Sequence, residues 1–488
     1  MLTLAHVLEA LTGLSFAAAR DLRTVAQPIA AVVIDSREAT PSALFVALRG
    51  ERTDGHEYAA QAFRQGAVAA LVERAPPGVD APLLDLAGPL DAAALARVQP
   101  PVCLCVPSSL KALQRLAAYW RARFSVRVIG VTGSVGKTST KELVAAVLQR
   151  RFTTLKSEGN YNNEIGLPLT LLKLRPEHTR AVLEMGMYDV GEIAMLCEIA
   201  RPAVGVITMI APVHLERLGS LERIITAKTE LVQALPAEAD GGVAVLNADD
   251  ATVMGMRTHT RARIVTYGLK PGADVRATHI QGMGLEGIRF RLHAGGESFS
   301  VKVPLLGRHS AHTALRAAAV GWVEGMAWEE ILAGLQFSAV QLRLVAVPGP
   351  GGSVVLDDTY NASPDSTIAA LNLLAELDGR RVAVLGDMLE LGSYEIAGHQ
   401  IVGLRAREVV DLLVTVGPRG QIIAAAALGA GMPPGAVHRF EAHEEAVDFL
   451  MRESRAGDVI LVKGSRAVHM DKIVEALSQP TESGPRGH

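Results

Sequence analysis

The stretch Val126–Lys141, VRVIGVTGSVGKTSTK, joins a run of β-branched residues to a glycine-rich turn and a lysine–threonine pair. The β-branched run predicts a buried strand, and the residues from Lys137 onward predict a helix. A glycine-rich turn between a strand and a helix directs several backbone N–H groups into one small cavity, and the helix dipole strengthens the attraction of that cavity for anions. The stretch therefore predicts a phosphate-binding loop.

The side chains of this predicted loop also suit a nucleotide. Lys137 can reach the β- and γ-phosphates, and the hydroxyl of Thr138 can bind Mg²⁺. The strict pattern has glycine where this chain has Val131, so the match is to the shorter G-x-x-G-K-T form. A tight structural turn is the alternative interpretation, but the Lys-Thr pair after a strand favours phosphate binding. The residues expected to surround ATP here are Gly133, Ser134, Val135, Gly136, Lys137, Thr138 and Ser139.

Length and composition limit the class of protein. The 488 residues predict about three domains of roughly 150 residues each, and 49% hydrophobic residues provide ample core. A net charge of −3 without a long basic run argues against nucleic acid as a partner, as do aromatic residues at only 4%. No segment predicts membrane insertion or a signal peptide, so we expect a cytoplasmic protein and a monomer. The three cysteines fit neither a disulfide framework nor a zinc site.

The order of predicted strands and helices divides the chain into three α/β units. Residues 1–124 predict a small α/β domain that ends in an amphipathic helix over 108–124. Residues 125–343 alternate strands with helices, which implies a mostly parallel sheet with helices on both faces, and antiparallel strands are expected within 263–305. Residues 344–488 alternate again in a Rossmann-like order, without the G-x-G-x-x-G fingerprint of dinucleotide-binding domains.

Three chemically active side chains follow the predicted strands of the second unit. Glu184 ends a strand, His214 lies in a loop after the next strand, and Lys228 lies on the helix that follows. A carboxylate at a strand end beside a phosphate loop is well placed for the hard cation that accompanies ATP. Taken alone, each residue has an ordinary explanation, as a helix cap, a loop histidine or a solvated lysine. Their order behind a phosphate loop favours a common site.

Several segments together resemble one family of enzymes, the Mur ligases. In chain order, these segments are TGSVGKTSTKE, NYNNEIGLPLTLL, EMGM, HLERLGS followed by TAKTE, DDTYNASPDS, LGDMLELG and LVKGSR. The early segments DSR and GERTDGHEYAAQAFRQGA resemble the N-terminal domain of the family. The resemblance covers nearly the whole chain, and LGDMLELG and YNASPDS are far more specific than the phosphate loop.

The resemblance implies an ATP-dependent ligase with three domains. These are a UDP-substrate domain over 1–124, an ATP-binding P-loop domain over 125–343 and a Rossmann-like ligase domain over 344–488. Within the family, the chain most resembles the members that join D-alanyl-D-alanine to UDP-N-acetylmuramoyl-tripeptide in peptidoglycan synthesis, forming ADP and phosphate. The γ-phosphate of ATP would pass to the substrate carboxylate, and the amine of the dipeptide would displace it from the acyl phosphate. Cell wall biogenesis, cell shape and cell division would depend on this step.

The resemblance also assigns roles to individual residues. The catalytic set would be Lys137, Glu184, His214 and Lys228. Mg²⁺, with two ions expected, would be held by Thr138, Glu184, His214 and Lys228. Lys228 would be carbamylated, because Mg²⁺ would repel a bare ammonium by roughly 4 kcal/mol per unit charge at about 4 Å and an effective dielectric of about 20. Beyond the phosphate loop, ATP would contact Asn247, His312, Arg343, Asp358, Tyr360 and Asn361. The substrates would contact Ser36, Arg37, Asn162, Asn163, Asp387, Lys463, Ser465 and Arg466.

Two other functions stay open at this point. Another amino-acid ligase of the same superfamily, such as the one that adds the third residue or a folylpolyglutamate synthase, would share most of these motifs. A D-N-P-R segment is expected in the third-residue enzyme and is absent here, where YNASPDS stands in the third unit instead. A P-loop nucleotide switch that forms no bond would not need Glu184, His214 and Lys228, and it would hydrolyse ATP without an acceptor amine.

Overall fold

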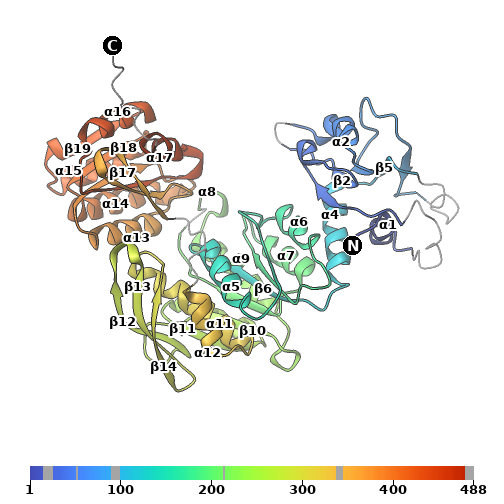
Figure 1. Ribbon diagram of the computed structural model, residues 1–488, viewed down its shortest axis with the longest axis horizontal. Helices are drawn as coiled ribbons and strands as arrows, with labels where there is room; N and C mark the ends of the chain where they lie inside the picture. Colours follow the sequence, from blue (N-terminus) through green and yellow to red (C-terminus); the bar gives the residue numbers. More distant parts are fainter. Residues whose placement is uncertain (15–25, 51–52, 89–98, 213–214, 337–343, 479–488) are drawn as a thin grey trace, which may run out of the picture.

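The computed structural model describes residues 1–14, 26–50, 53–88, 99–212, 215–336 and 344–478. Within these residues the strands form three sheets, of five, nine and six strands. Figure 1 shows three bodies in a row, with the N-terminal one in blue at one end, the C-terminal one in orange and red at the other, and the middle one between them. This arrangement confirms the prediction of three α/β domains. One sheet gives way to the next between Cys105 and Arg127 and between Val303 and Val345.

The N-terminal sheet is parallel throughout and covered on both faces. Its central strands are short runs of small and aliphatic residues that are buried at every position, which is typical of a parallel sheet between helices. α1 (Leu4–Thr12) packs on one face and α2 (Ala59–Arg64) on the other. In spatial order the strands are β1 (Ala31–Val33), β2 (Ala43–Val46), β3 (Ala69–Val72), β5 (Val102–Cys105) and β4 (Leu83–Asp85).

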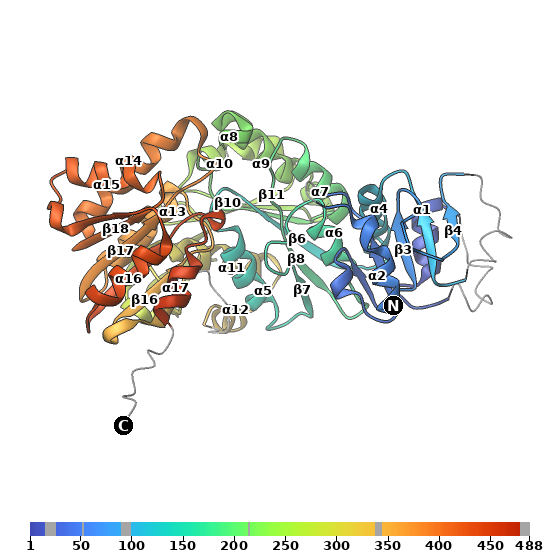
Figure 2. The same cartoon turned by 90° about the horizontal axis from the view of Figure 1, so that it is seen from above.

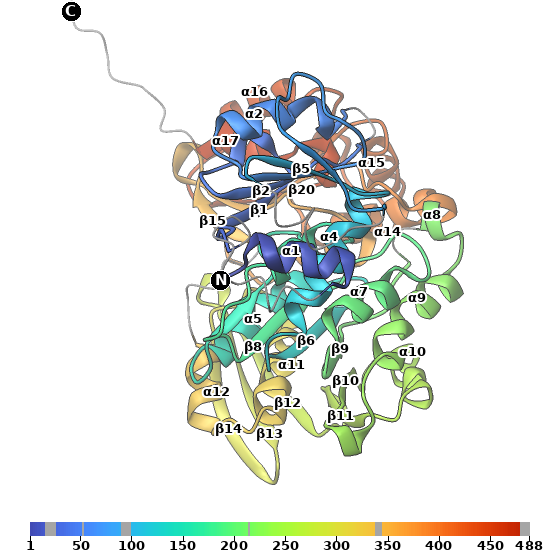
Figure 3. The same cartoon turned by 90° about the vertical axis from the view of Figure 1, so that its right-hand side faces the viewer.

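α4 (Ser109–Arg121) packs against both the N-terminal and the middle domain. Its buried face belongs to one continuous hydrophobic core that includes α1 and the middle-domain helices α6 (Gly166–Leu171) and α7 (Glu192–Ala200). The indole N–H of Trp120 donates a 3.1 Å hydrogen bond to the carbonyl oxygen of Leu174. Figure 3, seen from the N-terminal end, shows α1, α4 and α7 next to one another. The predicted amphipathic helix is therefore the element that joins the first two domains.

The middle sheet places the phosphate-loop strand β6 (Arg127–Thr132) between β8 (Arg180–Glu184) and β9 (Val204–Ile207). These strands are parallel, as predicted, so their carboxyl ends share one edge of the sheet. The antiparallel strands that the sequence predicted extend this same sheet at its far side. The full spatial order is β14 (Glu297–Val303), β13 (Ile288–Ala294), β12 (Val275–Gly282), β11 (Arg263–Gly268), β10 (Val243–Asn247), β9, β6, β8 and β7 (Thr154–Lys156).

Helices cover both faces of the middle sheet. α5 (Lys137–Leu148), α11 (Ala311–Val323) and α12 (Trp328–Leu335) share a core on one face. α7 and α9 (Leu221–Gln233) lie on the other face. Alternate residues of each strand point to the two faces, so a buried strand needs apolar side chains at nearly every position. That requirement explains the unbroken apolar runs from which the sequence predicted these strands.

The C-terminal sheet has four central strands that the sequence predicted and two edge strands that it did not. The edge strand β15 pairs antiparallel with β16, and the other edge strand, β19, pairs parallel with β18. Both edge strands are only four residues long, and β15 is mostly exposed while β19 is partly buried, so neither gives the long buried pattern by which a strand is recognised. In spatial order the strands are β15 (Val345–Pro348), β16 (Val354–Asp358), β20 (Asp458–Lys463), β17 (Arg380–Gly386), β18 (Leu412–Val416) and β19 (Val437–Phe440). The covering helices are α13 (Pro364–Ala375), α14 (Glu395–Val409), α15 (Gly420–Gly429), α16 (His443–Glu453) and α17 (Asp471–Ser478).

Two contacts between the C-terminal and middle domains involve glycines that lie very close to the facing element. At one, Gly282 at the end of β12 lies so close to α13 that an added Cβ would be 2.2 Å from Oε2 of Glu376. At the other, a Cβ on Gly392 would be 2.8 Å from the backbone nitrogen of Glu216 in α8 (Leu215–Leu218). Figure 1 shows α13 above the β12–β13 hairpin, and Figure 2 shows α8 on the side of the middle domain that faces α14. These contacts fix the present orientation of the two domains.

Among the described helices, none is both long enough and apolar enough to cross a lipid bilayer.

Candidate active site

The phosphate loop turns between β6 and α5 as the sequence predicted. Gly133 and Gly136 have φ angles of 141° and 84°, which glycine adopts at little cost. A Cβ on Gly133 would lie 1.8 Å from Oγ1 of Thr208 at the end of β9, so no larger residue fits at that position. Residues 135–139, which form the end of the loop and the first turn of α5, remain partly open to solvent. The loop therefore presents the N-terminus of a helix at the carboxyl edge of the sheet, where anions bind.

Two side chains hold the shape of this loop. Ser134 is buried, and its hydroxyl donates to the carbonyl oxygen of Ala211 at 3.0 Å and accepts from the N–H of Ala211 at 2.9 Å. The ammonium of Lys137 donates to the carbonyl oxygens of Gly133 and Ser134 at 2.9 and 3.3 Å. Lys137 therefore folds over the loop, so its positive charge lies where phosphate oxygens would bind.

Glu184 is 1% exposed, and three neighbours orient it. The hydroxyl of Thr138 donates to Oε2 at 2.7 Å, and Nδ2 of Asn162 donates to Oε1 at 2.9 Å. The backbone N–H of Glu184 donates to the hydroxyl of Ser157 at 3.2 Å. A buried carboxylate costs free energy unless such bonds stabilise it, so this carboxylate is held in one orientation. The structure thus brings Thr138 and Glu184 together as predicted and adds Asn162 to the same cluster.

Lys228 lies on α9 and is only 1% exposed. Burial lowers the pKa of its amine well below the ordinary value, and the positive charge of Lys137 lowers it further. Burial therefore shifts Lys228 toward the neutral amine relative to a solvated lysine. A solvated surface lysine, which was the ordinary interpretation of this residue, is wrong.

Several predicted site residues lie outside this cluster or outside the described part of the chain. His214 and Arg343 fall on positions that the structure does not describe. Asn163 accepts the N–H of Gly166 at 2.9 Å and so stabilises the turn before α6. In the N-terminal domain, the hydroxyl of Ser36 donates to Oε1 of Gln61 at 3.0 Å, while Arg37 is exposed.

Asp35 pairs with Arg37 on the surface of the N-terminal domain. A 2.6 Å ion pair joins the two side chains, and the hydrogen bonds of Arg37 lower the pKa of Asp35 to about 2. The guanidinium of Arg37 nevertheless reaches solvent, so it can exchange this partner for another anion.

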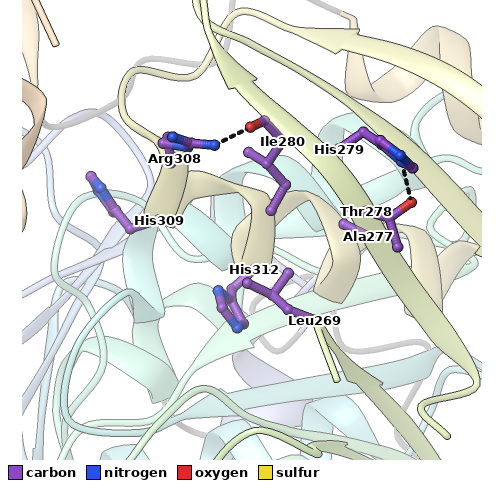
Figure 4. A pocket seen from close by; sticks show the side chains of 8 residues that line it. All are labelled: Leu269, Ala277, Thr278, His279, Ile280, Arg308, His309 and His312. Carbon is purple, nitrogen blue, oxygen red and sulfur yellow. Dashed lines mark hydrogen bonds between the residues drawn. The ribbon is translucent and has the colours of Figure 1, made fainter. Parts of the chain in front are cut away.

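A pocket of about 510 Å³ opens beside the start of α11. Figure 4 shows Arg308, His309 and His312 on the helical side of this pocket and Thr278–Ile280 on the strand side. His312 Nε2 lies 2.7 Å from Oδ2 of Asp249, and burial lowers the pKa of His312 despite that carboxylate.

Asn247 lies near the base of this region, at the end of β10. It is buried, its Nδ2 donates to the carbonyl oxygen of Thr208 at 3.3 Å, and its Oδ1 accepts the N–H of Asp249 at 3.0 Å. Asn247 and His312, both predicted to contact ATP, therefore each bond to Asp249, on the side of the phosphate loop where β9 and β10 end.

Arg316, on α11, is a candidate site residue that the sequence analysis missed. Its side chain is buried, and its guanidinium donates to the carbonyl oxygens of His312 and Gly136 at 3.0 and 3.4 Å and to the hydroxyl of Thr140. Burial lowers the pKa of Arg316. The guanidinium thus places a positive charge directly behind the phosphate loop. An arginine at an otherwise apolar helix face is the signal that could have revealed it.

At the carboxyl edge of the C-terminal sheet, the predicted residues of two neighbouring strands meet. Lys463 is 2% exposed, and its ammonium donates to Oδ2 of Asp358 at 2.7 Å and to the carbonyl oxygen of Asn361 at 2.9 Å. The guanidinium of Arg466 lies 5.3 Å from the ring centre of Tyr360. These five predicted residues form one cluster because β16 and β20 are parallel neighbours.

Asp387 and Ser465 join the same edge through β17. The carboxylate of Asp387 accepts the N–H groups of Arg419 and Gly420, each at 2.9 Å, at the start of α15. The N–H of Ser465 donates to the carbonyl oxygen of Asp387 at 2.9 Å, and the hydroxyl of Ser465 accepts the N–H of Leu389 at 2.9 Å. Both side chains therefore shape the edge of the sheet.

The C-terminal edge faces the nucleotide side of the middle domain. Crowding by neighbouring atoms and the nearby charges of His312, Arg316 and Lys463 lower the pKa of His309, although its side chain is still exposed to solvent. Lys463 belongs to the C-terminal sheet and His309 to the middle domain, so an electrostatic effect between them crosses the domain junction. His309 also lines the pocket and reaches solvent there. The Lys463 end of the C-terminal sheet edge is thus close enough to the middle domain to act on a residue of the pocket.

Three family descriptions match the chain in the order of its domains. They are the catalytic domain of the Mur ligase family over 28–120, the Mur ligase middle domain over 131–321 and the Mur ligase, glutamate ligase domain over 342–466. The chain belongs to the Mur ligase family. The matched ranges of this Mur ligase contain the phosphate loop, Glu184 and Lys228 in the middle domain and Asp358 and Lys463 in the C-terminal domain.

Characterised relatives resemble this Mur ligase over nearly its whole length. The UDP-N-acetylmuramoyl-tripeptide–D-alanyl-D-alanine ligase of Escherichia coli strain K12 is 37% identical over 92% of this chain and 94% of its own. A crystal structure of MurF from Acinetobacter baumannii covers 98% of both chains with a TM-score of 0.81 and 32% identity. MurF ligase from Thermotoga maritima, in complex with ADP, gives a TM-score of 0.74 and 29% identity over 94% of this chain and 98% of that one. These similarities confirm the prediction of a ligase of this family that uses ATP.

Proposed function

We propose that this Mur ligase joins D-alanyl-D-alanine to UDP-N-acetylmuramoyl-tripeptide at the expense of ATP, in the synthesis of peptidoglycan precursors. The observation that carries the proposal is the similarity to ligases of that name over more than nine-tenths of the chain. The geometry supports it, because the phosphate loop, Glu184 and Lys228 lie together in the middle domain, while the bonded pair Lys463 and Asp358 lies at the edge of the C-terminal sheet, within electrostatic reach of His309.

The chemistry explains why a phosphate loop belongs in a peptide-bond-forming enzyme. A carboxylate reacts poorly with an amine because its oxygen is a poor leaving group. Transfer of the γ-phosphate to that oxygen gives an acyl phosphate, and the dipeptide amine then attacks the carbonyl carbon and releases inorganic phosphate. Such a transfer depends mainly on positioning and on neutralising charge. Lys137, Arg316 and the N–H groups at the start of α5 supply that charge around the phosphates.

Magnesium fits the cluster around Glu184. The carboxylate of Glu184 and the hydroxyl of Thr138 are hard oxygen ligands at 2.7 Å from each other, which suits a small divalent cation. His214 lies next to α8 in the sequence and is proposed as a ligand of a second ion. When bound, Mg²⁺ would neutralise charge on the phosphates of ATP.

Lys228 fits a carbamate, since the buried neutral amine that the structure favours is the form that reacts with CO₂. The nitrogen lone pair adds to the carbon of CO₂, one proton is released, and a carbamate anion remains. The modification thus replaces a potential positive charge beside Lys137 by a negative one.

The remaining predicted residues are proposed as contacts to the three substrates. Asn247, His312, Arg343, Asp358, Tyr360 and Asn361 would contact ATP. Ser36, Arg37, Asn162 and Asn163 would contact the UDP-linked substrate, with Asn162 also orienting Glu184. Asp387, Lys463, Ser465 and Arg466 would serve the peptide or the dipeptide. We expect a cytoplasmic monomer.

Phosphate release from ATP, measured across a panel of UDP-muramoyl peptides with and without D-alanyl-D-alanine, tests the proposal. We expect release to require both the tripeptide substrate and the dipeptide. A tripeptide labelled with ¹⁸O at its terminal carboxyl group should pass one labelled oxygen into the released phosphate. Label that never reaches phosphate would rule out the acyl phosphate.

The same panel separates the alternatives. Another amino-acid ligase of the superfamily would accept a different acceptor peptide or a single amino acid in place of the dipeptide. A nucleotide switch would release phosphate at the same rate whether or not an amine is present.

A further inference from the structure

His399 lies in α14, and its side chain is fully buried beneath the loop that follows β17. Its Nδ1 lies 2.7 Å from the carbonyl oxygen of Glu395, and its Nε2 lies 3.1 Å from the backbone nitrogen of Met388. A carbonyl oxygen can only accept a hydrogen bond, so Nδ1 carries the proton and Nε2 accepts the N–H of Met388. These two contacts require the neutral ring.

The loop Asp387–Gly392 is held at one end by the C-terminal sheet edge. Asp387 accepts two N–H groups of α15 through its carboxylate and the N–H of Ser465 through its carbonyl oxygen. The N–H of Leu389 donates to the hydroxyl of Ser465. Met388 lies between these two residues. The hydrogen bond described for its N–H is the one to His399.

At its other end the loop contacts the middle domain. Glu390 has a φ of 64°. This left-handed backbone conformation is uncommon in residues other than glycine. Its carbonyl oxygen lies 3.5 Å from the backbone nitrogen of Glu216 in α8, and Gly392 packs against the same residue. α8 begins directly after His214 in the sequence, so the loop links the C-terminal sheet edge to the segment that carries a proposed metal ligand.

We propose that His399 is a positioning residue, whose neutral imidazole holds the loop Asp387–Gly392 in the conformation that receives D-alanyl-D-alanine and contacts α8. The inference rests on the proposed function and deepens it. The charged groups that face the ring are Asp387 at the loop, Glu395 on its own helix and Arg419 at the start of α15. An apolar side chain of similar size would fill the space but leave the N–H of Met388 buried without an acceptor.

Three substitutions of His399 test the proposal. His399→Gln retains an acceptor for the N–H of Met388, His399→Leu removes it, and His399→Asn keeps the polarity on a side chain too short to reach that N–H. We expect the KM for D-alanyl-D-alanine to rise about fivefold or more in the Leu and Asn variants and to stay within about twofold of the parent in the Gln variant. The KM for ATP should change much less in all three, because the loop 387–392 contains none of the proposed ATP contacts.

His56→Leu is a matched control. His56 is also fully buried, and its Nε2 accepts the backbone N–H of Glu73 at 2.8 Å, but it lies in the N-terminal domain. This control should lower the melting temperature as His399→Leu does, while the KM for the dipeptide stays at the parental value. An equal rise of that KM in His56→Leu, or failure of His399→Gln to restore it, would overturn the proposal.

Hydrogen–deuterium exchange of the segment 387–392 makes the test independent of catalysis. We expect exchange in this segment to accelerate in the Leu and Asn variants and to remain slow in the Gln variant. Unchanged exchange in the Leu and Asn variants would overturn the anchoring role. If the unsubstituted protein shows no dipeptide-dependent phosphate release, the proposed function is wrong. The exchange rates of the segment 387–392 would still show whether His399 anchors the loop.

Discussion

The hydroxyl of Thr138 lies 2.7 Å from Oε2 of Glu184, and this hydrogen bond joins the first turn of α5 to the last residue of β8. The two residues are 46 positions apart in sequence. They meet because β6 and β8 are parallel neighbours, so the helix that follows one begins beside the end of the other. This pair is the point at which the phosphate loop and the proposed metal ligands become one site.

Replacing Glu184 by glutamine tests the metal role of its carboxylate. Glutamine keeps the size and can still accept the bond from Thr138, so the protein should fold normally. The lost charge should lower kcat by about a hundredfold or more, because the stabilisation of charge around the phosphates is weakened. Steady-state phosphate release measures the effect, and Glu198→Gln, at an exposed position on α7, is the control. Near-parental activity of Glu184→Gln would argue against metal binding at this carboxylate.

Replacing Lys228 by alanine tests the carbamate. We expect activity to be lost and then partly restored when a short carboxylic acid is added, because the acid can occupy the space of the missing carbamate. Lys173→Ala, at an exposed lysine, should need no such addition. Phosphate release over a series of acid concentrations measures the rescue. A folded Lys228→Ala protein that no acid restores would count against the modification.

Arg316→Ala should destabilise the middle domain and weaken ATP binding together. The substitution leaves a cavity and removes the donors to Thr140 and to the carbonyl oxygen of Gly136, at a cost of about 2–4 kcal/mol. We expect a melting temperature lower by roughly 5–10 °C and a higher Kd for ATP. Arg308→Ala, on the same segment but exposed, should lower the melting temperature much less. Equal effects of the two substitutions would contradict this role of Arg316.

The pH dependence of stability should report on His399. Burial lowers the pKa of His399 in the folded protein, whereas the unfolded chain keeps a value of about 6.5. The unfolded state then binds more protons, so the stabilisation is complete above about pH 6.5 and is lost as the pH falls toward the folded-state pKa. Melting temperatures of the parent and of His399→Gln, measured from pH 8 down to about pH 5, should therefore converge on acidification. A difference that is constant with pH would mean that His399 does not titrate in this way.

Substrate binding should close the crevice between the middle and C-terminal domains. The proposed ATP contacts lie in both domains, with Asn247 and His312 in the middle domain and Asp358 in the C-terminal domain, so bound ATP would draw the two domains together. Small-angle scattering should show a smaller radius of gyration with a non-hydrolysable ATP analogue and UDP-N-acetylmuramoyl-tripeptide than with neither. An unchanged scattering profile would contradict closure.

The elements that the sequence predicted correctly are those with a continuous local signal. The strands β6, β8 and β10 are buried on both faces, so each is an unbroken apolar run that can be recognised without its neighbours. The edge strands β15 and β19 are only partly buried and were missed, because an edge strand is defined by the strand it pairs with.

The candidate site likewise contains residues with a local sequence signal, which could be predicted, and residues without one, which could not. The phosphate loop could be predicted because its glycines, its lysine and its threonine are consecutive, and backbone geometry alone brings them together. Asn162 was predicted among the substrate contacts, but its hydrogen bond to Glu184 could not be read from a spacing of 22 residues. Arg316 was missed because its partners, Gly136 and Thr140, are nearly two hundred positions away.

The three α/β domains, the phosphate loop and the family could be predicted from the amino-acid sequence, since each is encoded in short continuous segments. The folded structure was needed to show that Lys228 is buried beside a second positive charge, that Asp387 accepts N–H groups at the start of α15, and that His399 bonds to the loop above it. Burial, pKa and hydrogen-bond partners depend on atoms supplied by distant strands and helices. Sequence spacing does not specify those atoms, because the packing of parallel strands determines which segments share an edge.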